Sequence, residues 1–194
     1  MTEQELVTRA KSGDDEAFAQ LMRANEKRIY NLTLRMTGNP EDAMDLAQEA
    51  FLNAWRGLKF FQGDSAFSTW VYRLASNACI DHLRRKKRRQ DISAPMPAVE
   101  EDDSQPDIPD DRFRPDQELE RRELRRTVIR SLEQLSDEHR QVLVMRELNG
   151  LSYQEIADVL DLEAGTVKSR IARARNSLRK ILVESGNFST PPSS

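Results

Sequence analysis

The sequence predicts an all-α fold: two small helical domains joined by a flexible acidic linker, the C-terminal domain being a helix-turn-helix. Three observations favour this prediction. Apolar side chains recur every three or four residues along most of the chain, which is the period of a helix buried on one side. The chain has only 7 glycines, and no stretch shows the apolar-polar alternation of a half-buried strand. Residues 91–117 are rich in proline and acidic side chains, which favours a solvated segment.

The charge of the 194 residues is distributed in three blocks. The net charge is only -3, but residues 1–90 carry +3, residues 91–120 carry -9 and residues 121–194 carry +3. An asymmetry of this kind says more about partners than the total does. We therefore expect four parts: an N-terminal domain at 1–90, the linker at 91–117, a C-terminal domain at 118–182 and a disordered tail at 183–194.

Composition argues against several classes of protein. No apolar run approaches the roughly 18 residues of a membrane span, and the N-terminus lacks the apolar core of a signal peptide. Cys79 has no second cysteine to pair with, which fits a reducing cytosol, and we expect it to be buried. With only His82 and His139 beside it, a zinc site is not expected. Because paired catalytic carboxylates, an activated nucleophile and a glycine-rich phosphate loop are not recognisable, we expect neither an enzyme nor a cofactor.

The N-terminal domain is expected to contain at least three helices. The first crosses residues 14–38 and ends at Gly38. Asn39 can cap the next helix, 40–56, and Pro40 suits its first turn. A loop with aromatic residues then leads to a third helix at about 66–88.

The C-terminal domain is expected to begin with a helix near 117–134, followed by a second helix capped by Ser136 that ends near Asn149. Ser152 and Glu155 form a capping box, with Leu151 and Ile156 as a hydrophobic staple, so a short helix begins at Tyr153. Helicity resumes after about four residues, the length of the turn in a helix-turn-helix. Glu163 is a weak cap for this second helix.

A helical wheel assigns roles on this second helix. Val167, Ile171, Ala174 and Leu178 fall together and are expected to face inward. We expect Ser169 and Arg173 to reach base edges in the major groove, with Arg173 favouring guanine. Ala172 can offer its methyl group to thymine, and Lys168, Arg170, Arg175 and Arg179 are expected to hold phosphates. The predicted duplex-binding set is Thr166, Lys168, Ser169, Arg170, Ala172, Arg173, Arg175 and Asn176.

The N-terminal domain offers two further surfaces. Helix 40–56 has a polar, mostly acidic side, which suits a basic protein partner; it comprises Asp42, Asp45, Gln48, Glu49 and Asn53. The loop and the helix after it combine aromatic rings, a glycine, an amide and a basic run. Bases of a single strand stack on such rings, and the basic run can neutralise phosphates. The predicted single-strand set is Phe61, Gly63, Asn77, Arg84, Arg85 and Lys86, with Phe60 beside it, whereas Trp70 is expected to be core.

Three segments resemble functional regions of bacterial RNA polymerase sigma factors, of the extracytoplasmic-function (ECF) group of the sigma-70 family. The group's polymerase-docking helix is similar to DAMDLAQEAFLNAW, its reader of the promoter −10 element to GDSAFSTWVYRLASNACIDHLRR, and its −35 reader to GLSYQEIADVLDLEAGTVKSRIARAR. The resemblance covers residues 1–90 and 118–182, and the motifs stand in the family's order. It implies a specificity subunit that binds core polymerase and promoter DNA.

The resemblance also implies particular partners. Asp45, Gln48 and Glu49 would face the clamp helices of the polymerase's largest subunit, and the flap region would meet the C-terminal domain. Phe61 and Asn77 would line a pocket for a flipped −10 base. An anti-sigma factor, often membrane-bound, would hold the cytoplasmic chain until a stress signal arrives. No small-molecule substrate is implied.

Other interpretations of these residues stay open. A dimeric helix-turn-helix repressor or activator would not need the acidic helix or the aromatic loop. A helical adaptor between proteins would not need the basic recognition face. The run RRKKRR also resembles a nuclear localisation signal, and the linker is either a passive tether or a mimic of nucleic acid in a polymerase channel.

Overall fold

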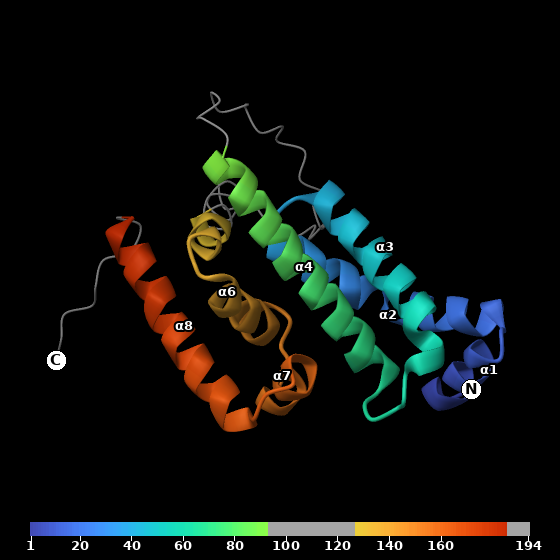
Figure 1. Cartoon of the computed structure of the whole chain (residues 1–194). Helices are drawn as coiled ribbons and strands as arrows, with labels where there is room; N and C mark the ends of the chain where they lie inside the picture. Colours follow the sequence, from blue (N-terminus) through green and yellow to red (C-terminus); the bar gives the residue numbers. More distant parts are fainter. Residues whose placement is uncertain (93–126, 186–194) are drawn as a thin grey trace, which may run out of the picture.

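The computed structural model describes residues 1–92 and 127–185, and within these ranges it contains helices and no strand, which confirms the predicted all-α class (Figure 1). The elements in order are α1 (Glu3–Lys11), α2 (Asp15–Thr37), α3 (Pro40–Gly57), the 3-10 turn η1 (Leu58–Phe60), α4 (Phe67–Ile92), a helical stretch at 127–133, α6 (Asp137–Leu143), the π-helical turn η2 (Val144–Leu148), α7 (Tyr153–Leu160) and α8 (Ala164–Glu184). We call residues 1–92 the N-terminal module and residues 127–185 the C-terminal module. Most of the predicted linker lies outside the described residues.

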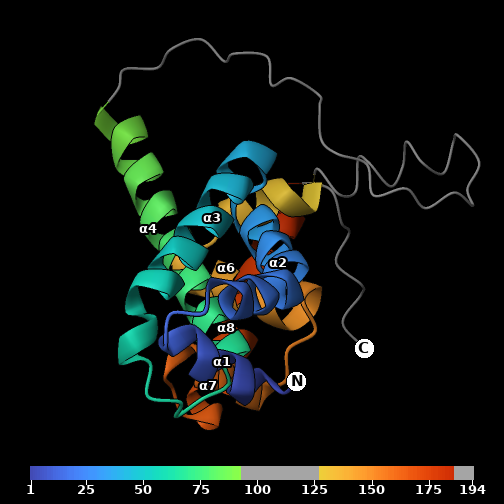
Figure 2. The same ribbon diagram turned by 90° about the vertical axis from the view of Figure 1, so that its right-hand side faces the viewer.

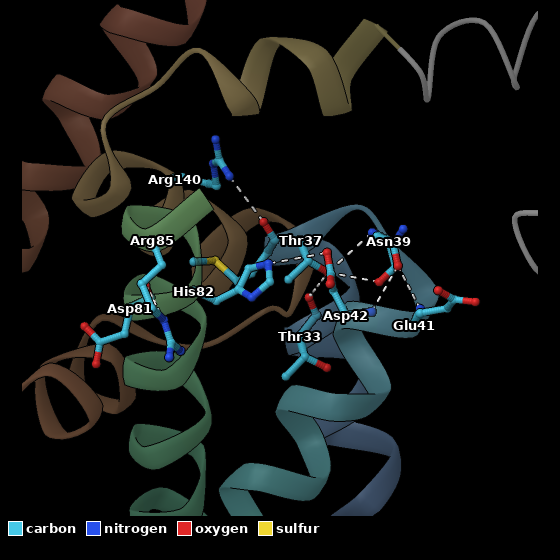
Figure 3. A network of polar contacts seen from close by, with 10 residues as sticks. Thr33, Thr37, Asn39, Glu41, Asp42, Asp81, His82, Arg85 and Arg140 are labelled. Atoms are coloured by element: carbon cyan, nitrogen blue, oxygen red, sulfur yellow. Dashed lines mark hydrogen bonds and ion pairs between the residues drawn. The ribbon is translucent and has the colours of Figure 1, made fainter. Parts of the chain in front are cut away.

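The turn between α2 and α3 forms as its sequence predicts. Gly38 ends α2 in the left-handed conformation, at φ 71°. The Asn39 side chain then accepts hydrogen bonds from the backbone N–H groups of Glu41 and Asp42, at 2.8 and 3.0 Å, and Pro40 opens α3 (Figure 3). The Thr33 hydroxyl donates to the carbonyl of Ala43 at 2.8 Å, which joins the two helices below the turn.

Two helix limits differ from the prediction. Helix α4 runs to Ile92, past the predicted domain limit at residue 90. It therefore includes the first two residues assigned to the linker. Helix α8 runs to Glu184 and so includes the first two residues of the predicted tail. Of the helix predicted near 117–134, only the part from residue 127 lies within the described residues.

The C-terminal module forms the predicted helix-turn-helix from local signals. Ser152 and Glu155 make both hydrogen bonds of the capping box, at 3.1 and 2.7 Å. Helix α7 ends at Leu160 and is followed by its C-cap Asp161, whose φ of 56° makes it the only described non-glycine residue in the left-handed region. Glu163 precedes α8 without a capping hydrogen bond, as its weak capping propensity predicts.

The two modules pack directly against each other in this structure, with α4 lying between α3 and the C-terminal helices (Figures 1 and 2). Buried and partly buried polar contacts cross the junction. The Gln141 amide donates to the Ser76 hydroxyl at 2.7 Å, and Asn149 donates to the Tyr72 hydroxyl at 2.6 Å. Burial raises the pKa of Tyr72 to about 12.

A buried guanidinium also lies at this junction. Arg140 lies beside the turn between α2 and α3 (Figure 3). It is 6% exposed and donates to the carbonyls of Leu132, Glu133 and, across the junction, Met36. Burial lowers the pKa of Arg140, since desolvation penalises its charged form. Carbonyl acceptors therefore take the place of water around a charge that would otherwise be costly to bury.

Candidate nucleic-acid interface

The predicted duplex-binding residues occupy the outer side of α8. Its inner side is formed by Val167, Ile171 and Ala174, which are at most 1% exposed. Every member of the predicted set is exposed except Arg170, which is half-buried. The apolar inner stripe therefore fixes which side of α8 is offered to a ligand.

Arg173 is held along the outer face of α8 by the residue one turn before it. Its Nη2 lies 3.3 Å from the hydroxyl of Ser169, and its Nε lies 3.4 Å from the carbonyl of the same residue. The Ser169 hydroxyl in turn donates to the carbonyl of Thr166 at 2.9 Å. The structure thus brings together Ser169 and Arg173, the two residues for which base contacts are predicted.

The flanks of α8 carry ion pairs that the sequence did not predict. Arg175 donates from Nη2 and Nε to one carboxylate oxygen of Glu147, at 2.6 and 3.0 Å. The Glu147 carboxylate raises the pKa of Arg175, chiefly through this hydrogen bond. On the opposite flank, Arg170 Nη2 lies 3.5 Å from a carboxylate oxygen of Glu138. Both glutamates belong to the helix before the helix-turn-helix.

The predicted single-strand residues fall on α4 and its preceding loop. Gly63 and Asn77 are exposed, and Gly63 has a φ of 84° that favours glycine. Arg84, Arg85 and Lys86 are also exposed. Arg84 lies 3.5 Å from Asp137 across the module junction.

Phe61 differs from its prediction in an important respect. It is 8% exposed, and its ring stacks on Trp70 with centroids 4.7 Å apart and an angle of 27°. Phe67 packs edge-on against both rings, so in this structure Phe61 belongs to an aromatic core and offers no open face to a base. Phe60, the ring beside it in sequence, is 75% exposed. Trp70 is partly buried against the core, as expected.

Two residues of α1 shape this loop, and sequence analysis missed both. The Glu3 carboxylate accepts hydrogen bonds from the backbone N–H groups of Phe67 at 2.8 Å and Ser68 at 3.3 Å, which caps the start of α4. Lys11 donates to the carbonyl of Phe61 and lies over its ring. Helix α1 therefore anchors both ends of the segment 61–68.

The predicted protein-docking face lies on α3, with four of its five residues exposed: Asp45, Gln48, Glu49 and Asn53. The fifth, Asp42, is half-buried, and its Oδ2 lies 3.3 Å from Nε2 of His82 on α4, a contact that is an ion pair only when the imidazole is protonated (Figure 3). His82 is correspondingly half-buried.

An apolar groove of about 890 Å³ runs between α2 and α3 beside this face. Phe18, Met22, Phe51, Leu52 and Trp55 line it, and Gln48 borders both the groove and the docking face. Leu52 and Trp55 are exposed at 54% and 40%, values that are high for side chains of this kind.

The described residues contain no cluster of three or more side chains suited to hold a metal ion. Their helices also include none that is long and apolar enough to span a membrane.

Comparison with known proteins identifies the family of this chain. The sigma-70 region 2 family matches residues 21–89, and the sigma-70 region 4 family matches residues 125–178. The chain belongs to the sigma-70 family of RNA polymerase sigma factors, in its ECF group.

Individual relatives match over nearly their whole length. The RNA polymerase sigma-H factor of Pseudomonas aeruginosa is 40% identical over 184 residues, which is 93% of each chain. The ECF sigma factor SigW of Bacillus subtilis is 37% identical over 176 residues, covering 91% of this chain and 94% of that one. Among solved structures, CnrH in complex with the cytosolic domain of CnrY matches with a TM-score of 0.64 and 26% identity, covering 94% of this chain and 97% of that chain.

Proposed function

We propose that this sigma factor directs promoter-specific transcription initiation by binding promoter DNA in two forms, the −35 duplex and the melted −10 strand. Core polymerase catalyses RNA synthesis. The observation that carries the proposal is the exposed outer side of α8, where Ser169 and Arg173 lie together. A helix of this kind enters the major groove of duplex DNA and reads base edges there. We assign α8 to the −35 element.

The N-terminal module is assigned to the melted −10 strand. Gly63 and Asn77 are accessible on the loop and on α4, and the cations from Arg84 to Lys86 can follow the phosphates of a single strand. Because Phe61 is stacked in the core, the exposed ring of Phe60 is the better candidate to stack on a base. A base contact by Phe61 itself would require its ring to leave Trp70.

Core polymerase is assigned to α3. Asp45, Gln48, Glu49 and Asn53 offer an acidic, amide-bearing face that suits basic groups on the clamp helices. The adjoining groove adds apolar area, which raises affinity more than exposed charges do. In this scheme the C-terminal module meets the flap region of the polymerase.

Control by an anti-sigma factor completes the proposal. The structural relative CnrH was solved with the cytosolic domain of a second protein, CnrY, which supports protein-based control. We propose a cytoplasmic sigma factor that a membrane-associated partner holds until a stress signal releases it. In this proposal residues 1–90 form the domain that binds polymerase and the −10 element, and residues 118–182 form the domain that binds the −35 element.

Run-off transcription tests the proposal. Purified chain is added to core polymerase over a library of promoter fragments, and we expect transcripts that start at defined sites sharing −35 and −10 sequences. The replacement Glu49→Lys, which reverses charge on the docking face, should abolish these transcripts and polymerase pull-down together. A chain that binds duplex DNA but confers no specific initiation would instead indicate a conventional repressor or activator.

A further inference from the structure

Arg170 and Arg175, on the two flanks of α8, differ in their surroundings from two other basic residues of the helix, Lys168 and Arg173. Arg175 is paired with Glu147 at 2.6 Å, and Arg170 with Glu138 at 3.5 Å. By contrast, among residues 1–92 and 127–185 no carboxylate lies within 4.0 Å of Lys168 or Arg173. Two of the cations predicted to hold phosphates are therefore paired with carboxylates, whereas within the described residues Lys168 and the predicted base reader Arg173 are not.

The pairs are arranged so that they can compete with DNA. Side-chain exposure is 52% for Arg175 and 46% for Glu147, so a phosphate can approach this pair from solvent. Both donors on one edge of the Arg175 guanidinium are used by a single glutamate oxygen. A phosphate must displace this oxygen or share the cation with it, and the nearby negative charge repels the phosphate in either case.

The glutamates come from one helical segment behind α8, and each reaches a different flank. Glu138 lies in the first turn of α6, and Glu147 lies in the π-helical turn η2. Helix α6 packs against α8 and also contacts η2, so the backbone that carries both glutamates is held beside α8. The pairing of the two arginines with these glutamates is thus a property of the C-terminal module's fold.

We propose that Glu147 and Glu138 are positioning residues that restrain the sequence-independent attraction of α8 for DNA phosphates by engaging Arg175 and Arg170. The proposal rests on the proposed function of α8 as the duplex reader. Phosphate contacts supply affinity without sequence information, whereas base contacts discriminate. Engaging the flank cations therefore raises the share of the binding free energy that depends on Arg173.

Salt-dependent binding tests the proposal without knowledge of the promoter. Affinity of the full chain for a short fluorescent duplex of arbitrary sequence is measured by anisotropy over a range of salt concentrations. Glu147→Gln keeps the size of the side chain and removes its charge. We expect the slope of log K against log salt to steepen by about 0.9, the value for one additional neutralised phosphate. We expect affinity at low salt to rise about twofold to fivefold, as befits an exposed ion pair.

Three further variants give matched controls. Glu26→Gln makes the same change in net charge on α2 and should leave the slope unchanged. Glu147→Gln in an Arg175→Ala background should have no effect on the slope, because the cation that it releases is absent. Glu138→Gln should repeat the effect through Arg170, which keeps the proposal testable if one variant does not fold.

The outcomes separate the proposal from the function on which it rests. An unchanged slope in Glu147→Gln, together with a slope lowered by Arg175→Ala alone, would show that Arg175 already holds a phosphate, and would overturn the proposal. Specific initiation by the wild-type protein in that case leaves the proposed function intact. If the wild-type chain bound no duplex at any salt concentration, the assignment of α8 would fall and the proposal with it.

Discussion

Gln141 and Ser76 meet across the junction of the two modules, where the amide nitrogen donates to the hydroxyl oxygen at 2.7 Å and both residues are at most 6% exposed. The contact joins α6 of the C-terminal module to α4, the helix assigned to the melted strand. Promoter binding that draws the modules apart must break it. The contact is a polar one within a continuous apolar core, and water can solvate both groups once the modules part.

We predict that Ser76→Ala loosens the junction. The variant leaves the Gln141 amide without its acceptor while the modules are in contact, at a cost of about 1–3 kcal/mol. Small-angle X-ray scattering should therefore report a larger average radius of gyration. Thr33→Val is the matched control, since it removes a hydrogen bond to Ala43 within the N-terminal module. Thr33→Val should lower thermal stability and leave the radius of gyration unchanged. If Ser76→Ala also left the radius of gyration unchanged, the prediction would be contradicted.

Replacement of Arg173 by alanine should reduce discrimination between promoters and leave polymerase binding intact. Loss of one bidentate base contact costs about 1–3 kcal/mol of discrimination. The measurement compares the affinity for a selected −35 duplex with that for an unrelated duplex. Arg179→Ala, on the same exposed helix, should weaken both affinities in equal proportion. If Arg173→Ala instead lowered DNA and polymerase binding equally, Arg173 would be a structural residue.

Glu3→Ala should destabilise the start of α4 and the segment before it. The side chain caps the N–H groups of Phe67 and Ser68, and loss of such a cap costs about 0.5–2 kcal/mol. Thermal unfolding and proteolysis of the segment 61–66 provide the measurements. Glu26→Ala, on the exposed side of α2, should change neither. Equal behaviour of the two variants would mean that the cap contributes nothing measurable.

The C-terminal module should lose stability in acid partly through Glu155. Hydrogen bonding from Ser152, first from its backbone N–H and then from its side chain, holds the pKa of Glu155 below the usual value, with a smaller contribution from Arg28. A carboxyl with a lowered folded-state pKa stabilises the fold fully above its unfolded pKa and loses this contribution as pH falls through the folded value.

The variant Glu155→Gln checks this pH dependence. Its amide oxygen can still accept from Ser152, so the capping box persists in part. Urea unfolding is measured from neutral pH down through the range in which carboxylates titrate. The free energy of unfolding should fall less steeply with decreasing pH for the variant than for the wild type. Glu163→Gln, at the uncapped start of α8, should retain the wild-type decline. A variant curve parallel to that of the wild type would exclude this role for Glu155.

The parts of the fold that sequence predicted are those set by local signals. The Ser152–Glu155 capping box, the Asn39 cap and the spacing of Val167 and Ile171 each operate within a few residues, and each is present in the structure. The role of α1 could not be predicted, because it depends on a contact between Glu3 and Phe67, 64 positions apart, although the helix itself carries a local signal. Its own capping box at Thr2 and Glu5 was the available signal.

The candidate site was predicted less completely. Exposure of Ser169 and Arg173 follows from helical periodicity alone, whereas the partners of Arg170 and Arg175 come from a separate helix. Phe61 illustrates the same limit: composition places a ring in the loop, but tertiary packing decides which of two neighbouring phenylalanines is buried. The DNA and polymerase contacts of all predicted residues stay predictions until they are measured.

Cys79 is the single cysteine of the chain, and it is fully buried. Burial raises the pKa of its thiol to about 12, so almost none of it is the thiolate that alkylating reagents attack. Cysteines introduced on the surfaces of α3 and α8 would consequently take up dyes without background from the native residue. The wild-type background is thus already suited to fluorescence measurements that test whether the two modules separate when promoter DNA binds.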